Sequence, residues 1–152
     1  MELHNSMKEE TSCGAIIYFL RKNKPVYLLL KYTNYWGFVK GGIEKGENEE
    51  QTLKREAKEE ANISKLEIIN GFRHEIIYFY KFKETIKKKV IFLLGQISEE
   101  QSKNVKISFE HEAFKFLEYG EAQNILVHKN EKEILQKADE FLKDWLKQNR
   151  LF

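Results

Sequence analysis

The first half of the chain alternates between short apolar runs and polar connections. Residues 13–20 form an apolar run, and residues 26–31 form a second one after the polar residues 21–24 and Pro25. Apolar runs of this length, rich in β-branched and aromatic side chains, are typical of buried strands, and a short polar connection between them is typical of a hairpin. The pattern therefore predicts a β-hairpin near the N-terminus.

Helical periodicity begins at residues 49–61. Leu53 and Ala57 lie four residues apart among strong helix formers, and Asn62 stands where a helix would end. A shorter helix is predicted at 120–126 and a longer amphipathic one at 131–148. The apolar stripe of the longer helix consists of Ile134, Leu135, Ala138, Phe141, Leu142 and Trp145. We expect this stripe to pack on a sheet.

The remaining apolar segments predict three more strands, at residues 76–80, 90–97 and 113–117. A basic hairpin connection at 81–89 and a loop at 98–104 would join them. Residues 1–10 are polar and are predicted to form a flexible N-terminal tail. No repeat or linker divides the chain, so we predict a single α/β domain over residues 1–152.

Composition narrows the class of protein. Of 152 residues, 41% are hydrophobic, which is too many for a disordered chain. The 26 Lys and Arg residues nearly balance 24 Asp and Glu residues, so no net field favours DNA or a membrane surface as a partner. The single cysteine, Cys13, cannot form an intramolecular disulfide, and no apolar run approaches the ~20 residues that span a bilayer. We therefore expect a cytoplasmic protein.

Three carboxylates fall on one face of the helix predicted at 49–61. At about 100° per residue, Glu59 and Glu60 both lie within about 60° of Glu56 around the helix axis. Like charges at this spacing repel each other, and a divalent cation such as Mg²⁺ or Mn²⁺ would remove the repulsion. The alternative is a solvated Glu/Lys face. A double glycine before the helix, and an ion pair expected between Glu47 and Arg55, favour the metal site.

Residues 41–63 resemble the signature of the Nudix hydrolase family. The matching positions are Gly41, Glu47, Arg55, Glu56, Ala57, Glu59, Glu60 and Ile63. Asn62 stands where the family has glycine, and asparagine is the next best residue at a left-handed helix end. The resemblance implies an α/β/α sandwich built around a mixed β-sheet.

The resemblance also implies roles for these residues. Glu56, Glu59 and Glu60 would bind Mg²⁺, or Mn²⁺, and neutralise a pyrophosphate while water attacks phosphorus. Gly41 would supply a backbone ligand or a geometry that a side chain would obstruct. Glu60 and Arg55 would thus belong to the catalytic set, Arg55 by orienting a glutamate.

Outside this segment the chain looks most like the asymmetric diadenosine tetraphosphate hydrolases of the family, in residues 36–42, 69–78, 88–92 and 108–117. By that resemblance Glu110 would be a further metal ligand or the general base, and Lys40 and Lys88 would contact phosphate. Tyr78 and His128 would stack on the adenine ring. The competing interpretations are a surface acid for Glu110, a solvated hairpin tip for the lysines, and ordinary packing for Tyr78 and His128.

The resemblance implies metal-dependent hydrolysis of diadenosine tetraphosphate to ATP and AMP. Two departures leave the substrate open, because Val39 replaces a usual proline and Gly42 is also seen in RNA 5′-pyrophosphohydrolases. The alternatives are hydrolysis at an RNA 5′ end or of another nucleoside diphosphate derivative, and a Nudix-fold protein that binds nucleotide without catalysis. We expect a small nucleotide as partner, and a monomer or weak homodimer.

Overall fold

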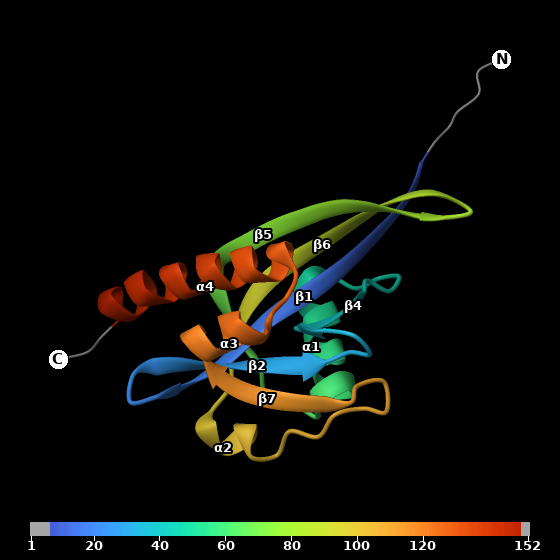
Figure 1. Ribbon diagram of the computed structural model, residues 1–152. Helices are drawn as coiled ribbons and strands as arrows, with labels where there is room; N and C mark the ends of the chain where they lie inside the picture. The colour runs from blue at the N-terminus through green and yellow to red at the C-terminus, as the bar shows by residue number, and fades with distance from the viewer. Residues whose placement is uncertain (1–6, 150–152) are drawn as a thin grey trace.

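The computed structural model describes residues 7–149, and these are built around one mixed β-sheet (Figure 1). Its strands are β1 (Lys8–Arg21), β2 (Lys24–Lys31), β3 (Trp36–Gly37), β4 (Val39–Gly42), β5 (Glu67–Phe82), β6 (Glu84–Gln96) and β7 (Ala113–Glu118). The main order is β3-β2-β1-β6-β5, while β4 pairs with β1 and β7 with β2. The β1–β6 pairing is parallel and the others are antiparallel, so the predicted mixed sheet is confirmed.

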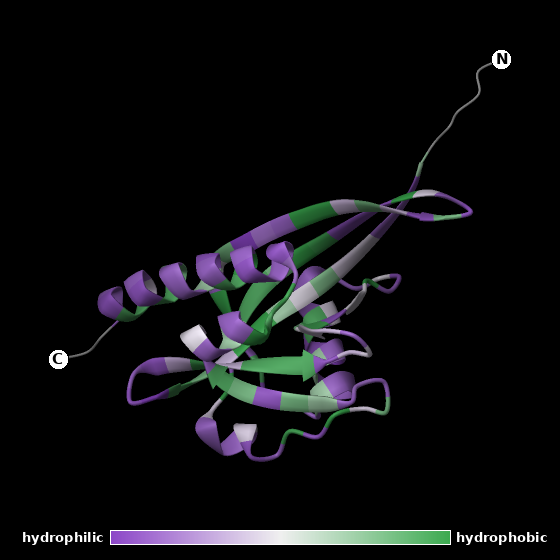
Figure 2. Cartoon of the chain, viewed as in Figure 1, coloured by the Kyte–Doolittle hydropathy of each residue, from purple (hydrophilic) through white to green (hydrophobic). Residues whose placement is uncertain are grey.

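Helices cover both faces of this sheet. Helix α1 (Glu49–Ala61) lies on one face, and α3 (Tyr119–Ile125) and α4 (Lys129–Gln148) lie on the other, while α2 (Glu99–Ser102) is a short turn of helix. Two buried hydrophobic clusters fill the two interfaces, one including Leu53 and Ala57 of α1 and the other Ile134 and Leu142 of α4. Figure 2 shows the corresponding pattern, with apolar strands inside and a polar outer surface on α4. The expected α/β/α layering is therefore confirmed.

Local signals in the sequence correctly located the first hairpin and the first helix. Strands β1 and β2 meet at Lys22 and Asn23, whose φ angles of 53° and 65° suit a tight hairpin turn. Helix α1 begins after Asn48, which forms a reciprocal capping box with Gln51. It ends at Asn62, which is left-handed with φ 58°. Asn62 thus ends the helix in the left-handed conformation at the position where the family has glycine.

Three expectations about the chain were wrong. Strand β1 begins at Lys8, so residues 8–10 are not part of a flexible tail; residues 1–6 of that predicted tail lie outside the described part of the chain. The basic segment 81–89 is mostly strand, because β5 runs to Phe82 and β6 starts at Glu84 with only Lys83 between them. Helix α2 lies within the predicted loop at 98–104.

The physical reason for the first two corrections is long-range pairing. Residues 8–11 align in parallel with residues 86–89, and this register sets acidic side chains of β1 beside lysines of β6. The Nζ atoms of Lys87 and Lys88 each lie 3.8 Å from a carboxylate oxygen, of Glu9 and Glu10 respectively. Neither segment has a local apolar pattern that predicts a strand, and the pairing is visible only in the fold.

Within residues 7–149, no helix combines the length and the apolar character that a membrane crossing requires.

Candidate active site

The carboxylates of α1 face the glycine pair at the end of β4. A Cβ atom on Gly41 would overlap the carboxylate of Glu56, so a side chain at residue 41 would displace Glu56 from its present position. Strand β4 is held in place by pairing with β1, where Gly41 lies opposite Cys13. The close approach of Gly41 explains why a side chain is excluded here, as the motif implied.

Arg55 links the loop before α1 to its carboxylates. Its Nε donates to Glu47 at 2.6 Å, and its Nη1 donates to Glu56 at 2.7 Å and to Glu59 at 3.0 Å. Its Nη2 donates to the carbonyl oxygen of Gly42 at 2.9 Å. The guanidinium lowers the pKa of Glu47 to about 2 and keeps that carboxylate ionised. The ion pair predicted between Glu47 and Arg55 is present, and Arg55 orients the neighbouring glutamates.

Glu60 is the buried member of the carboxylate set, with 6% of its surface exposed. Burial, followed by the neighbouring Glu56 carboxylate, raises its pKa to about 9, while a hydrogen bond from the Lys40 backbone N–H opposes the shift. Its Oε1 atom lies 3.3 Å from Nε2 of His111, but both atoms lack a hydrogen-bond partner of good geometry. A buried oxygen left without a partner is costly, so this site favours a positive ligand.

The donor set fits a hard divalent cation. Glu56, Glu59 and Glu60 offer carboxylate oxygens, and Gly41 leaves the space beside Glu56 free of a side chain. In the conformation seen, no three acidic, imidazole or thiol side chains within residues 7–149 are arranged to hold a metal ion. The Arg55 guanidinium instead bridges Glu56 and Glu59. These hydrogen bonds use only the Oε1 atoms of Glu56 and Glu59, so the Oε2 atom of each carboxylate is not bonded to Arg55.

Glu110 lies on the exposed loop between α2 and β7. Its charge is close enough to contribute to the raised pKa of Glu60, although burial and Glu56 contribute more. Its backbone N–H points toward Oγ of Ser108 at 3.4 Å. The loop also carries the buried His111, which sequence reasoning missed because one histidine beside Glu110 forms no recognisable spacing. Burial lowers the pKa of His111 and favours its neutral form.

A second cavity, of about 400 Å³, lies on the face of the sheet that carries α3 and α4. It is lined by Tyr35, Lys40, Tyr78, His128, Lys129, Asn130 and Glu131. Three of the four residues predicted to bind substrate, Lys40, Tyr78 and His128, therefore meet around one space. The fourth, Lys88, lies opposite Tyr78 in the β5–β6 register and on the same face of the sheet, outside the cavity lining.

Aromatic rings and one carboxylate shape this cavity. Tyr35 stacks on Tyr32 at 4.9 Å and meets the His128 ring edge-on at 5.0 Å. Oε1 of Glu131 is buried without a hydrogen-bond partner, and burial raises the pKa of this group. Sequence reasoning missed Tyr35 and Glu131. Tyr35 stands in the aromatic segment 32–36, which was a usable signal, whereas Glu131 looks like any first-turn helix acid.

Lys40 connects the carboxylate site to the aromatic cavity. Its backbone N–H donates to Glu60, and its side chain reaches the other face, where Nζ lies 5.6 Å and 5.8 Å from the ring centroids of Tyr32 and Tyr35. Nζ of Lys88 is fixed nearby on the same strand face by Ser12 Oγ at 2.8 Å. Lys40 thus lies between a set of acids that suits metal and a cavity that suits an aromatic ring, and Lys88 lies opposite Tyr78 of that cavity.

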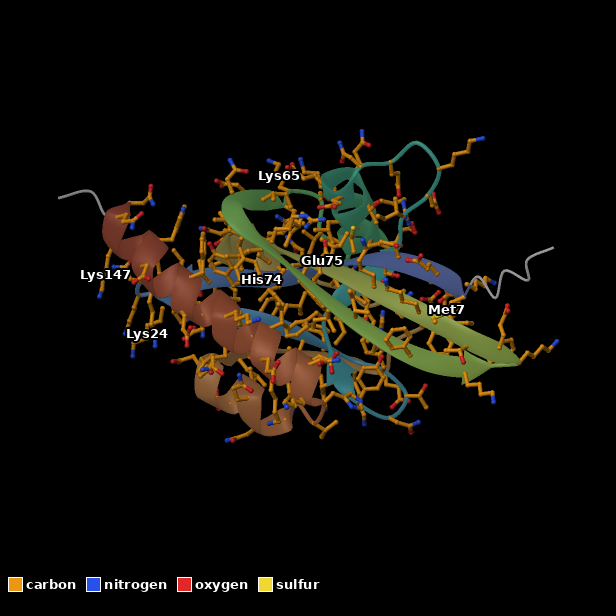
Figure 3. All side chains as sticks on the ribbon, turned by 90° about the horizontal axis from the view of Figure 1, so that it is seen from above. Met7, Lys24, Lys65, His74, Glu75 and Lys147 are labelled. Carbon is orange, nitrogen blue, oxygen red and sulfur yellow. The ribbon has the colours of Figure 1, made fainter. Side chains whose placement is uncertain are left out.

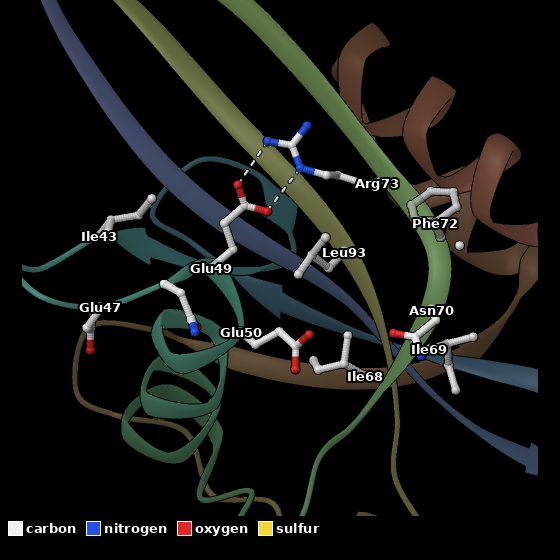
Figure 4. A pocket seen from close by; sticks show the side chains of 12 residues that line it. Ile43, Glu47, Glu49, Glu50, Ile68, Ile69, Asn70, Phe72, Arg73 and Leu93 are labelled. Atoms are coloured by element: carbon white, nitrogen blue, oxygen red, sulfur yellow. Dashed lines mark hydrogen bonds and ion pairs between the residues drawn. The ribbon is translucent and has the colours of Figure 1, made fainter.

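A larger cavity, of about 780 Å³, lies elsewhere, between the start of α1 and the bulge of β5 (Figure 4). It is bordered by Ile43, Ile68 and Leu93 and by the ion pair of Arg73 with Glu49. In this pair Nε and Nη2 of Arg73 donate to the two carboxylate oxygens of Glu49 at 3.0 Å and 2.9 Å. None of the predicted substrate-binding residues lines it. Its size alone therefore does not make it the active site.

Comparisons with known proteins agree with this geometry. The NUDIX domain model matches residues 11–138. The asymmetrical bis(5′-nucleosyl)-tetraphosphatase of Sus scrofa is 36% identical over 142 residues, covering 86% of this chain and 94% of that protein. A crystal structure of a C. elegans Ap4A hydrolase binary complex matches with a TM-score of 0.77 and 31% identity, covering 89% of this chain and 98% of that one. An RNA pyrophosphohydrolase of Sulfurovum sp. is 32% identical over 124 residues, covering 74% of this chain and 77% of that protein.

Proposed function

Because the chain belongs to the NUDIX family and is a pyrophosphohydrolase related to the Ap4A hydrolases, we propose that it hydrolyses diadenosine tetraphosphate to ATP and AMP. Water attacks the phosphorus atom that becomes the phosphate of AMP. The observation that carries this proposal is the position of Lys40, whose backbone contacts Glu60 while its side chain lines the aromatic cavity. A substrate with a base and a long phosphate chain can reach both places at once.

We propose that Glu56, Glu59 and Glu60 hold Mg²⁺, with Mn²⁺ as a substitute, and that Gly41 keeps the space beside Glu56 open. The ion supplies charge neutralisation for the phosphates and lowers the pKa of a bound water. Arg55 keeps Glu56 and Glu59 oriented by donating hydrogen bonds to them. Glu110, on a loop that its neighbour His111 anchors beside Glu60, accepts the proton from the attacking water.

The substrate's base is assigned to the other face of the sheet, and its phosphates lead from there to the carboxylates. Tyr78, with His128 and Tyr35, provides aromatic surface for one adenine ring. The unpartnered oxygen of Glu131 accepts a hydrogen bond from the amino group of that ring. Lys40 and Lys88 neutralise phosphate charge along the path between the base and the carboxylates.

A second candidate function, removal of pyrophosphate from an RNA 5′ end, is favoured by the Sulfurovum relative and by Gly42. A nucleotide-binding protein without catalysis is the third, and the retention of Glu56, Glu59 and Glu60 argues against it. The nearly balanced charge likewise argues against DNA as a partner. The single cysteine, Cys13, is free and cannot form a disulfide within the chain, which supports our proposal of a reducing, cytoplasmic location.

A product-resolved competition experiment separates these functions. Purified protein with Mg²⁺ is given equal amounts of diadenosine tetraphosphate and 5′-triphosphorylated RNA, with ADP-ribose and nucleoside triphosphates in parallel reactions. We expect the dinucleotide to be consumed first, with little loss of rate as salt is raised. Preferential RNA turnover that falls steeply with salt would instead indicate an extended phosphate contact. Binding without turnover of any of these compounds would favour the third candidate.

A further inference from the structure

The outer edge of β5 is an unpaired strand edge within the described residues. β5 pairs with β6 on one side, and residues 7–149 provide no strand on its other side. Figure 3 looks onto this edge, with His74 and Glu75 along the strand, α4 to one side of it and α1 to the other. An open strand edge offers a row of backbone N–H and C=O groups to another strand.

The end of this edge carries large apolar side chains on both faces. The exposed ones are Ile77, Tyr78, Phe79, Tyr80 and Phe82, with Phe79 57% and Phe82 67% exposed. Soluble monomers usually protect an edge strand with charges, proline or a bulge. The bulge of β5 lies between Ile68 and Arg73, well before this segment, and leaves it unprotected.

The order of residues along the edge is complementary to itself. If two copies pair antiparallel about a two-fold axis at Tyr78, each Glu75 lies opposite Lys81 of the other copy, because the two positions are equally far from Tyr78. Between these charges, Ile77 faces Phe79. Shifting the centre to residue 77 would set Glu75 against Phe79, and shifting it to residue 79 would set Lys81 against Ile77. The charges therefore select a single register.

The rest of the fold leaves room for this pairing. Helix α4 contacts β5 near Gly71 and Phe72 through Phe141, and its first half lines a small space with residues 75–77 of β5, while the hairpin tip extends past the helix (Figure 1). In an antiparallel pair, the helix of the second copy would lie over the opposite end of the ladder. The pairing uses backbone groups in the plane of the sheet, so the Tyr78 side chain keeps its position in the cavity lining.

From this edge we infer that the protein self-associates into a symmetric dimer through residues 75–81 of β5, with two Glu75–Lys81 pairs across the interface. The paired strands would continue the sheet from one copy into the next. A ladder this short buries less area than a standard interface, so we expect a weak dimer with a micromolar dissociation constant. The inference does not depend on which substrate is hydrolysed.

Sedimentation of the full chain over a wide concentration series tests this inference through charge reversal. E75K places two lysine pairs, and K81E two glutamate pairs, across the interface. Unlike charges that face each other across paired strands stabilise the pairing and like charges destabilise it, so either variant alone should raise the dissociation constant at least about fourfold. Mixing the two variants restores both unlike pairs, so the mixture should associate about as strongly as the wild type.

K65E, which reverses an exposed lysine just before β5, is the matched control and should associate as the wild type does. Circular dichroism of each variant checks that the fold is retained. A wild type that stays monomeric up to hundreds of micromolar would overturn the inference. So would a dimer that E75K and K81E leave intact, or two variants that fail to associate when mixed while the wild type does.

Discussion

Replacing the buried Glu60 with glutamine tests how much the ionisation of this carboxylate destabilises the folded protein. Without metal, the folded protein holds the Glu60 proton up to a pKa of about 9, whereas the unfolded chain releases it near 4.5. Between these values the folded state binds one more proton, so this group makes the protein less stable as the pH rises. Below 4.5 both states are protonated and the penalty is absent.

The size of this pH effect on the free energy of unfolding follows from the pKa shift of Glu60. One pKa unit corresponds to about 1.4 kcal/mol, so the free energy of unfolding falls by about 1.4 kcal/mol per pH unit from this group alone. The E60Q variant lacks the titrating group. The stability of E60Q relative to the wild type should therefore increase by about 3 kcal/mol between pH 5.5 and pH 8.

Urea unfolding in the presence of EDTA, across that pH range, measures this difference. Taking the difference between the two proteins cancels the titrating groups that do not contact Glu60. The control is E50Q, which changes an exposed glutamate of the same helix and should differ from the wild type by an amount independent of pH. A difference for E60Q that is also flat would refute the reasoning, because Glu60 would then ionise as it does in the unfolded chain.

Other predictions concern the metal, the glycine and the cavity. Calorimetry in buffers of different ionisation enthalpy should show that binding of Mg²⁺ or Mn²⁺ at pH 7 releases about one proton from the wild type and none from E60Q. Equal proton release from both proteins would contradict the assignment of Glu60 as a metal ligand. G41A should lose metal-dependent turnover, and overpacking against Glu56 should cost about 1–3 kcal/mol of stability in urea unfolding; a fully active G41A would show that Glu56 needs no such space. K40M should lower kcat/KM for diadenosine tetraphosphate roughly tenfold or more, since hydrogen bonds to charged groups contribute about 1.5–3 kcal/mol, while K65M should not. Y78L should mainly raise KM, because stacking contributes about 1–3 kcal/mol per base, and an unchanged KM would place the base elsewhere.

The parts of the fold that could be predicted from the sequence are determined by residues close together in the chain. Helix α1 is defined by Asn48, Asn62 and the spacing of Leu53 and Ala57, all within a few residues of one another. The hairpin of β1 and β2 needs only two apolar runs and a turn. The length of β1 and the first part of β6 depends instead on pairing between residues 78 positions apart, as for Lys88 and Glu10. No local pattern carries that information.

The active site shows the same difference between local contacts, which the sequence predicts, and long-range contacts, which it does not. The motif predicted the Glu47–Arg55 pair, because loop and helix are adjacent in sequence. It could not predict that the Lys40 backbone would contact Glu60 while its side chain lines the cavity on the other face. His111 and Glu131 were missed for a related reason, since their significance lies in burial without a hydrogen-bond partner, which composition and spacing do not reveal. The roles of all the predicted site residues in metal binding, substrate binding and turnover remain predictions.

Hydrolysis of diadenosine tetraphosphate in ¹⁸O-labelled water with Mg²⁺, followed by mass spectrometry of the products, tests the central claim most directly. The account predicts equal amounts of ATP and AMP, with the label in AMP and none in ATP. Two molecules of ADP, label in ATP, or no hydrolysis would contradict it.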